Sequence, residues 1–274
     1  KKYEMFKDND VVCVATSGGN DSLNVLYLTN LYCKEHNIKC FALAIDEGIA
    51  GYRDHTLKDL EEFCNIHDIE LKIKSFKENF GDTLDNMKVK AMNELNKKPC
   101  TVCGVFRRTL LNRSAREFGA TKLVTGHNLD DESQSFMMNV VLGNMGHNAS
   151  LGPITGLQDN DKFVQRVKPL YFMLEKESRL YALLKNFKTD FVECPNVNLS
   201  FRATVRDELN MIENKLSGAK SGIVNSFLEI LPLLKEHYKN EKKVRTFNYC
   251  TRCGDACSGK ICNACKLEEE LIGK

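Results

Sequence analysis

Cysteine is the residue type that points most clearly to chemistry in this sequence, because the chain of 274 residues contains twelve. Four of them form two Cys-x-x-Cys pairs near the C-terminus, Cys250 with Cys253 and Cys262 with Cys265. Two such pairs in a short segment with few core-forming residues predict a zinc site, in which four thiolates complete a tetrahedron. Cys257 lies between the pairs and is either a bystander or an alternative ligand. The module would either clip the chain together or face RNA, and we favour RNA contact slightly.

Three further cysteines are spread over the body of the chain. Cys100 and Cys103 lie in PCTVCGVFRR, at the start of a predicted helix. The helix dipole, with the charges of Arg107 and Arg108, is expected to favour their thiolates. Cys194, in the sequence ECP, is the candidate third partner. Three thiolates are one too few for a closed zinc site and suit a [4Fe-4S] cluster with one open iron. The other four are expected to act as small apolar residues: Cys13, Cys33, Cys40 and Cys64.

A glycine turn, SGGNDS at residues 17–22, is the second candidate for chemistry. It lies between an apolar run and a helical pattern, which is the context that a phosphate-binding loop requires. Gly18 and Gly19 would let the backbone approach an anion closely. Asp21 and Ser22 could cap the helix or bind metal and phosphate. The turn matches neither the Walker A pattern nor GxGxxG.

The elements that must position these groups alternate between strands and helices. Short apolar runs predict buried strands at residues 11–16, 40–45, 71–75 and 122–125. Helical spacing follows at 23–37, 58–67, 84–96, 106–118, 130–142, 175–187, 201–215 and 223–237, and residues 143–165 are expected to form a long surface loop. This alternation predicts an α/β fold, a parallel sheet with helices on both faces, with ligands at the carboxyl ends of the strands.

Composition restricts the class of protein. With 42% hydrophobic and 28% charged residues, a disordered or collagen-like chain is excluded. The net charge of +2 neither requires nor excludes a nucleic-acid partner. Apolar runs are too short for a membrane span, so we expect a cytoplasmic protein whose cysteines form no disulfides. A break in composition divides the chain into a catalytic domain, 1–244, with a helical extension from about 170, and a zinc module, 245–274.

The glycine turn resembles the PP-loop, SGGxDS, of the ATP pyrophosphatases, which split ATP into AMP and pyrophosphate while adenylating a substrate. GHNLDDE at 126–132 resembles the second ATP motif of these enzymes, and IDEGIAGYR at 45–53 their strand-end segment beside the nucleotide. Asn20 departs from the pattern, since the family usually has lysine there. Loss of that charged contact is expected to cost about 1.5 to 3 kcal/mol of phosphate or transition-state stabilisation.

The whole set of motifs, in order, is similar to that of the tRNA 2-thiouridine synthetases of the archaeal and eukaryotic type. Members typically carry an N-terminal zinc module that is missing here, so truncation is expected. The resemblance implies that Cys100, Cys103 and Cys194 hold a [4Fe-4S] cluster, with Arg107 where part of the family has a catalytic lysine. Asp131 is implied both in catalysis and in ATP binding. The other implied ATP-binding residues are Ala15, Thr16, Ser17, Gly18, Gly19, Asn20, Asp21, Ser22, Ile45, Gly126, His127 and Asp130.

The resemblance implies 2-thiolation of a tRNA uridine, wobble U34 being expected. ATP with Mg2+ would adenylate the C2 oxygen, and sulfur from sulfide or a ubiquitin-like carrier would replace it. Arg108, Arg113 and Arg116 are plausible contacts for tRNA phosphates. A homodimer is also expected. The alternatives are a related enzyme that thiolates U54 or C32, and a non-catalytic iron-sulfur or zinc protein that binds RNA, for which Asn20 is the argument.

Overall fold

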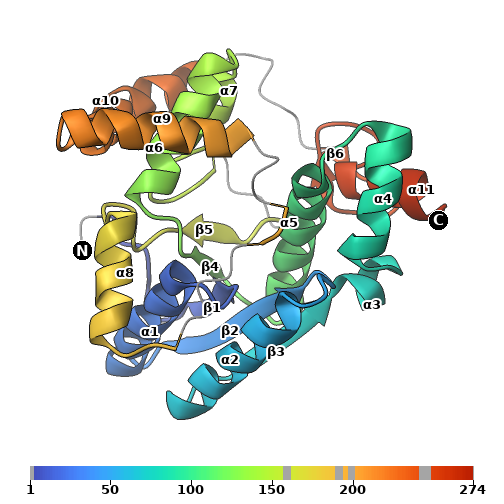
Figure 1. The fold of residues 1–274 in the computed structure, drawn as a ribbon, viewed down its shortest axis with the longest axis horizontal. Helices are drawn as coiled ribbons and strands as arrows, with labels where there is room; N and C mark the ends of the chain where they lie inside the picture. The colour runs from blue at the N-terminus through green and yellow to red at the C-terminus, as the bar shows by residue number, and fades with distance from the viewer. Residues whose placement is uncertain (1–2, 157–161, 189–193, 197–200, 241–247, 274) are drawn as a thin grey trace.

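Five strands in the computed structural model form one parallel sheet in the order β3-β2-β1-β4-β5 (Figure 1). The strands are β1 (Val11–Thr16), β2 (Lys39–Asp46), β3 (Leu71–Ser75), β4 (Lys122–Thr125) and β5 (Gln165–Val167). Four of them are the apolar runs expected to be strands, and the expected α/β class is confirmed. The structure describes residues 3–156, 162–188, 194–196, 201–240 and 248–273.

The strand β5 was not expected from the sequence. The prediction of a continuous surface loop over residues 143–165 is wrong, because helix α7 (Met145–Asn148) lies in this segment and β5 begins at Gln165. β5 is an edge strand that pairs only with β4 among the strands of the described part of the sheet. Its sequence lacks an apolar run because an edge strand is covered less completely than a central one.

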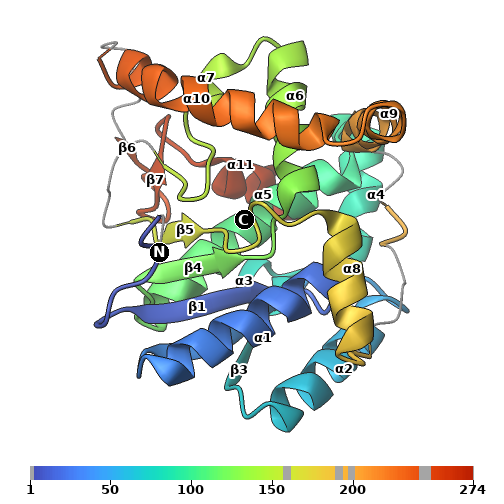
Figure 2. The same ribbon diagram turned by 90° about the vertical axis from the view of Figure 1, so that its left-hand side faces the viewer.

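Helices cover both faces of the sheet (Figure 2). On one face, α1 (Asn20–Glu35) and α2 (Arg53–Ile66) bury Leu26 and Leu60 against Val12. On the other face, α5 (Pro99–Glu117) buries Ala115 against Cys13 and Leu123. The alternation follows from the strand itself, since neighbouring residues such as 12 and 13 point to opposite faces. Helices α3 (Phe76–Phe80) and α4 (Leu84–Leu95) extend the layer that contains α5.

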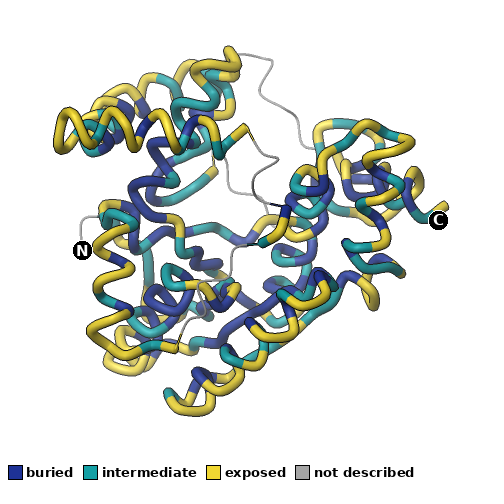
Figure 3. Tube along the Cα trace, viewed as in Figure 1, coloured by how far each residue is buried: buried dark blue, intermediate teal, exposed yellow. Residues whose placement is uncertain are grey.

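A further group of helices lies beyond the sheet (Figure 1). Helix α6 (Leu129–Val141) follows β4 and packs against α9 (Phe201–Lys215) and α10 (Ala219–Asn240). Helix α8 (Glu175–Leu184) packs against α1. Figure 3 shows a mostly buried sheet and exposed outer faces on α9 and α10. None of the helices in the described ranges is both long and apolar enough to cross a membrane.

The C-terminal segment packs against the hydrophobic core that α4 and α5 also line. It contains β6 (Asn248–Tyr249), β7 (Ala256–Cys257) and α11 (Asn263–Ile272), and α11 packs against α4 and α5. Leu267 and Leu271 belong to the hydrophobic cluster that also contains Phe106 of α5. The segment is therefore held by apolar contacts with α5 as well as by its own cysteines.

Candidate functional site

The glycine turn connects β1 to α1 at the carboxyl edge of the sheet. Within it the Ser22 hydroxyl accepts hydrogen bonds from the amides of Ser17 (3.2 Å) and Gly18 (3.1 Å) and donates one to the Gly19 carbonyl (2.8 Å). Asn20 is the first residue of α1. The loop therefore gathers backbone amides around one oxygen at a helix N-terminus, which is the geometry that binds phosphate.

Two glycines allow other segments to approach this loop. Gly18 has φ = 90°, and a Cβ there would lie 2.9 Å from the Thr56 carbonyl oxygen of α2. Gly126, in the turn after β4, would place a Cβ 2.9 Å from the Asp21 carbonyl oxygen. The structure thus brings the GHN turn against the start of α1, as the two ATP motifs require. Ala15 and Thr16 end β1, and Ile45 lies buried near the end of the neighbouring strand β2.

Carboxylates gather beside the glycine turn. Burial, with a further contribution from the charges of Asp131 and Glu175, raises the pKa of Asp21 to about 6. The Asp21 Oδ1 atom is buried and has no hydrogen-bond partner. Asp131 closes a capping box with Asn128 at the start of α6, and burial raises its pKa as well. A buried carboxylate oxygen without a partner, next to a second carboxylate, suits a hard divalent cation such as Mg2+.

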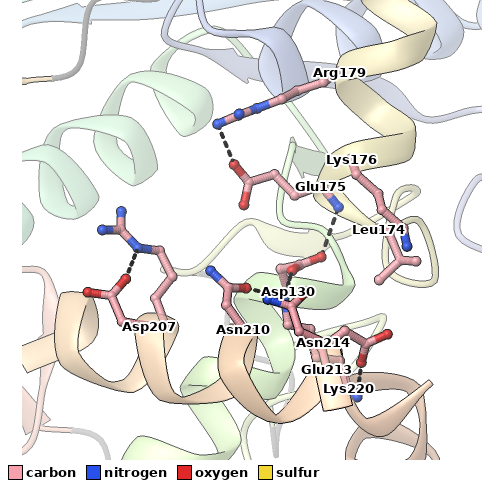
Figure 4. A pocket seen from close by; sticks show the side chains of 11 residues that line it. Asp130, Leu174, Glu175, Lys176, Arg179, Asp207, Asn210, Glu213, Asn214 and Lys220 are labelled. Atoms are coloured by element: carbon pink, nitrogen blue, oxygen red, sulfur yellow. Dashed lines mark hydrogen bonds and ion pairs between the residues drawn. The ribbon is translucent and has the colours of Figure 1, made fainter. Parts of the chain in front are cut away.

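Asp130 has a different set of partners. Its carboxylate accepts a hydrogen bond from the Glu175 amide at the start of α8 (2.8 Å) and forms a buried ion pair with Lys220 of α10. These groups line a cleft of about 560 Å³ between α8, α9 and α10 (Figure 4). Asp130 therefore joins three helices, and its role as an ATP ligand stays a prediction.

Cations surround His127 at the end of β4. Its Nδ1 atom lies 2.8 Å from the Thr125 hydroxyl. Burial, and then the charges of Lys168, Arg202 and other arginines, lower its pKa to about 3, so the ring is neutral at physiological pH. Lys168 is itself neutralised by a buried ion pair with Glu132 (2.6 Å). A neutral ring among cations can hydrogen-bond a bound anion without adding charge.

The three cysteines of the body meet at the start of α5. Cys100 and Cys103 lie in its first turns, after Pro99 at the N-terminus. The Cys100 thiol donates to the Asn196 carbonyl (3.2 Å), and the Asn196 amide lies 3.9 Å from the Cys194 sulfur. Among the described residues only the tail cysteines have sulfurs that all lie within 4.8 Å of one another. A wider set fits a cluster, in which each thiolate binds a different iron, better than it fits a single ion.

The expectation that the helix dipole and the arginines favour ionised Cys100 and Cys103 thiols is wrong for the protein alone. Burial raises the pKa of Cys103 to about 12, and the opposing charge of Arg107 is smaller in effect. Burial also raises the pKa of Cys100. Thiolates at this position therefore need a stronger positive charge than the arginines supply, and bound iron would provide it.

A chain of ionic contacts links the cysteines to the glycine turn. Arg53 of α2 donates to the Ser17 carbonyl (2.6 Å) and pairs with Glu47 (3.1 Å), and both side chains are buried. The other oxygen of Glu47 lies 3.7 Å from the Arg107 guanidinium, whose charge acts on Cys103. The two sites therefore lie at the same edge of the sheet and share Glu47.

The tail cysteines form the predicted four-sulfur site. The sulfurs of Cys250, Cys253, Cys262 and Cys265 lie within 4.8 Å of one another. Burial would raise the pKa of the Cys250 thiol, but hydrogen bonds from nearby backbone amides lower it to about 6. Four convergent sulfurs with amide donors fit zinc. The Cys257 thiol is turned to the Gly259 carbonyl (3.0 Å) and lies outside this group.

Two arginines that the sequence suggests as RNA contacts form ion pairs with the C-terminal segment. Arg113 of α5 donates to Asp255 (2.5 Å), and Arg116 lies 3.6 Å from the same carboxylate. These ion pairs favour a structural clip over an RNA-facing module, and the assignment of Arg113 and Arg116 as phosphate contacts stays a prediction. As expected, Cys13, Cys33 and Cys64 are buried, while Cys40 is half-buried.

Several site residues escaped the sequence analysis. Lys168 and Arg202 lie near His127 and Asp131 but belong to no motif that the sequence shows, and Glu132, the last residue of GHNLDDE, was not singled out as a site residue. Ser178 of α8 accepts from Asn24 (2.7 Å) behind the glycine turn. Arg53 was visible only as the last residue of the strand-end segment. These residues are brought together by the fold, and local spacing carries no signal for them.

Comparison with known proteins agrees with this geometry. The PP-loop domain family matches residues 1–212. The chain is 35% identical over 264 residues to the tRNA 2-thiolation protein NcsA of Haloferax volcanii, covering 94% of this chain and 81% of that protein. It is 34% identical to cytoplasmic tRNA 2-thiolation protein 1 of Dictyostelium discoideum over 97% of this chain and 72% of that protein.

A solved structure is similar over nearly the whole chain. The U34-tRNA thiolase NcsA from Methanococcus maripaludis, with its [4Fe-4S] cluster, superposes with a TM-score of 0.81 at 33% identity, covering 98% of this chain and 85% of that chain. Together with the matching motifs, these similarities place this chain in the PP-loop family and, within it, among the tRNA 2-thiolation proteins.

Proposed function

We propose that this protein replaces the O2 atom of a tRNA uridine, wobble U34, with sulfur in an ATP-dependent reaction. The proposal is supported by the family, by the relative whose cluster and U34 substrate are named, and by two sites at one edge of the sheet. Activation of a uracil carbonyl needs one site that handles ATP and a second that handles sulfur. The ionic contacts through Glu47 join two such sites.

In the first step the glycine turn would hold ATP. Its backbone amides and the start of α1 would face the phosphates, with Gly126 and His127 on the opposite side and Ile45 beside the nucleotide. Asp21 and Asp131 would hold Mg2+. The uridine O2 attacks the α-phosphorus, the bond to pyrophosphate breaks, and the uracil gains AMP as a leaving group.

In the second step a sulfur nucleophile attacks C2, and the C2–O2 bond breaks as AMP departs with the original oxygen. Cys100, Cys103 and Cys194 would hold a [4Fe-4S] cluster, which when bound supplies an open iron able to carry sulfur. Arg107 would stabilise negative charge between this site and the nucleotide. We propose sulfide or a ubiquitin-like carrier as the sulfur donor.

We further propose that Cys250, Cys253, Cys262 and Cys265 bind Zn2+ in a C-terminal module of residues 245–274, appended to a catalytic domain of residues 1–244. A cytoplasmic location and a homodimer belong to the same proposal. The module would serve as a structural support for α5. Asp255 pairs with Arg113 of this helix, while Leu267 and Leu271 lie in the hydrophobic cluster that its buried side chains also form.

The observation that carries the proposal is the shared position of the cysteine site and the glycine turn on the two sides of Glu47. The test is anaerobic purification, with iron and sulfide analysis, followed by reaction with unmodified tRNA, ATP and sulfide. Mass spectrometry of the digested tRNA would identify the product nucleoside. We expect about four iron atoms per chain and 2-thiouridine at the wobble position, both lost in Cys103→Ser.

Three results would contradict the proposal, each in a different part. Zinc without iron in the anaerobic protein would remove the sulfur chemistry. Binding of tRNA with no pyrophosphate release would instead favour a non-catalytic RNA-binding protein. A product at U54 or C32 would retain the chemistry and change the substrate position.

A further inference from the structure

One side chain of α5 forms hydrogen bonds with the backbone just before the edge strand β5. The Asn112 amide of α5 donates to the Lys162 carbonyl (2.8 Å), and its oxygen accepts from the Val164 amide (3.0 Å). Asn112 is therefore level with the residue that precedes β5. A short connection of residues 118–121 reverses the chain between α5 and β4, so α5 runs antiparallel to β4 and to its parallel neighbour β5.

Two arginines are displaced by similar distances, and in the same direction, from the contact between Asn112 and Val164. Arg108 is four residues before Asn112, about 6 Å along the helix. Arg166 is two residues after Val164, about 7 Å along the strand in the same direction. The guanidinium of Arg108 folds over Gly104, because a Cβ on that glycine would lie 3.0 Å from Nη1.

The strand register sets the direction of Arg166. Arg166 pairs with Leu123 of β4, and Leu123 faces the layer that contains α5. The next residue, Val167, is buried in the cluster on the opposite face, with α1 and α2. Alternation along the strand therefore turns Arg166 toward α5, where Arg108 lies.

No carboxylate of the described residues pairs with either guanidinium group. In the described part of the chain neither has a hydrogen bond or an ion pair through its side chain, and both are only partly covered by protein. Burial, and then the charge of Arg108, lower the pKa of Arg166 to about 10. Arg113 and Arg116 on the same helix, by contrast, share Asp255. The pair of Arg108 and Arg166 is thus a cationic site that lacks a protein anion.

We propose that Arg108 and Arg166 together bind a phosphodiester group of the RNA substrate. The proposal rests on the function proposed above and adds two residues that would hold the RNA backbone. Cys103 lies five residues before Arg108, about 8 Å along α5, so a phosphate at the pair would be close to the cysteine site. Two guanidinium forks can each donate two hydrogen bonds to one phosphate.

The position of the pair favours RNA over the phosphates of ATP. The glycine turn leads into α1, on the sheet face that α1 and α2 cover, whereas Arg166 points to the opposite face. The charge of Arg166 also acts on His127, so ATP affinity must be measured alongside RNA binding. β5 is also separated from β1 by β4. Arg108 lies near the middle of the same helix that carries Cys100 and Cys103, so an RNA strand that brings its base to the cysteines would run close to the pair.

The test compares Arg108→Gln, Arg166→Gln and the double variant with the native protein. Binding of an unmodified tRNA transcript is measured by fluorescence anisotropy at 50 to 200 mM salt, and ATP affinity is measured in parallel. Lys34→Gln removes one charge at the far end of α1, where Lys34 pairs with Asp68, and is the matched control. Arg108→Lys tests whether charge alone suffices.

We expect each single variant to weaken tRNA binding roughly tenfold and the double variant to flatten the salt dependence by about one to two units of slope, with unchanged ATP affinity. Thermal stability should not fall, because each change removes repulsion. Variants that bind tRNA as Lys34→Gln does would overturn the proposal, and an equal loss of ATP affinity would assign the pair to the triphosphate. Failure of the native protein to bind tRNA would instead contradict the proposed function.

Discussion

Replacing Asp21 with asparagine should stabilise the protein while weakening its use of ATP. Burial and the charges of Asp131 and Glu175 raise the Asp21 pKa to about 6, from a reference value of 3.8. At neutral pH the folded protein must therefore hold a carboxylate that its surroundings disfavour. A difference of about two pKa units corresponds to about 2 to 3 kcal/mol of lost stability, which asparagine would restore.

The pH dependence gives this prediction its sign. Because the folded-state pKa is raised, the native protein binds the proton more tightly than the unfolded chain between about pH 4 and 6. Native stability from this group is therefore lost as the pH rises through this window. The gain from Asp21→Asn should be full above about pH 6.5 and should disappear below about pH 4, where both states are protonated.

Calorimetry without nucleotide, at pH 7.5 and pH 5, measures the effect, with Asp8→Asn as an exposed control of the same type. We expect an increase in Tm of about 5 to 10 °C at pH 7.5, a smaller one at pH 5, and much weaker binding of ATP with Mg2+. Equal stability of the variant and the native protein at pH 7.5 would refute the reasoning, as would a gain that does not change with pH.

Four further perturbations test the C-terminal segment and the glycine turn. Asp255→Asn should lower the free energy of unfolding by about 1 to 2 kcal/mol, because it leaves Arg113 without its carboxylate, and denaturant unfolding with Asp8→Asn as an exposed control would measure this. Zinc chelation should lower Tm further and release one zinc per chain, and Cys257→Ser should leave the zinc content unchanged, since its thiol lies apart from the four sulfurs. Asn20→Lys should raise ATP turnover about 10- to 100-fold by restoring a charged phosphate contact, as a pyrophosphate-release assay would measure; unchanged kinetics would mean that another cation already supplies it.

Local patterns predicted much of this molecule. The glycine turn follows a doubly buried strand and precedes a helix, so its position at the sheet edge could be deduced from neighbouring residues alone. The two tail pairs have the spacing of a zinc site, and the structure brings the same four sulfurs together. In both cases the residues that matter are close in sequence, and their spacing carries the information.

Contacts between distant segments could not be predicted in this way. Arg113 looked like part of a basic patch, but its partner Asp255 is 142 residues away. Cys103 lies in a helix start that favours thiolates, yet the burial that raises its pKa comes from packing with other elements. The strand β5 was missed because its edge position removes the apolar run by which a central strand is identified. The role of Arg113, the pKa of Cys103 and the exposure of β5 each depend on solvation or on charges that are distant in sequence, and local patterns carry no information about these.

The shared core of α5 and the C-terminal segment has a consequence for biosynthesis. Leu271 is among the buried residues that pack with Phe106, one turn from Cys103. During translation, α5 emerges from the ribosome long before that leucine exists. The cysteine-bearing helix therefore reaches its final packing only after residue 271 has been made.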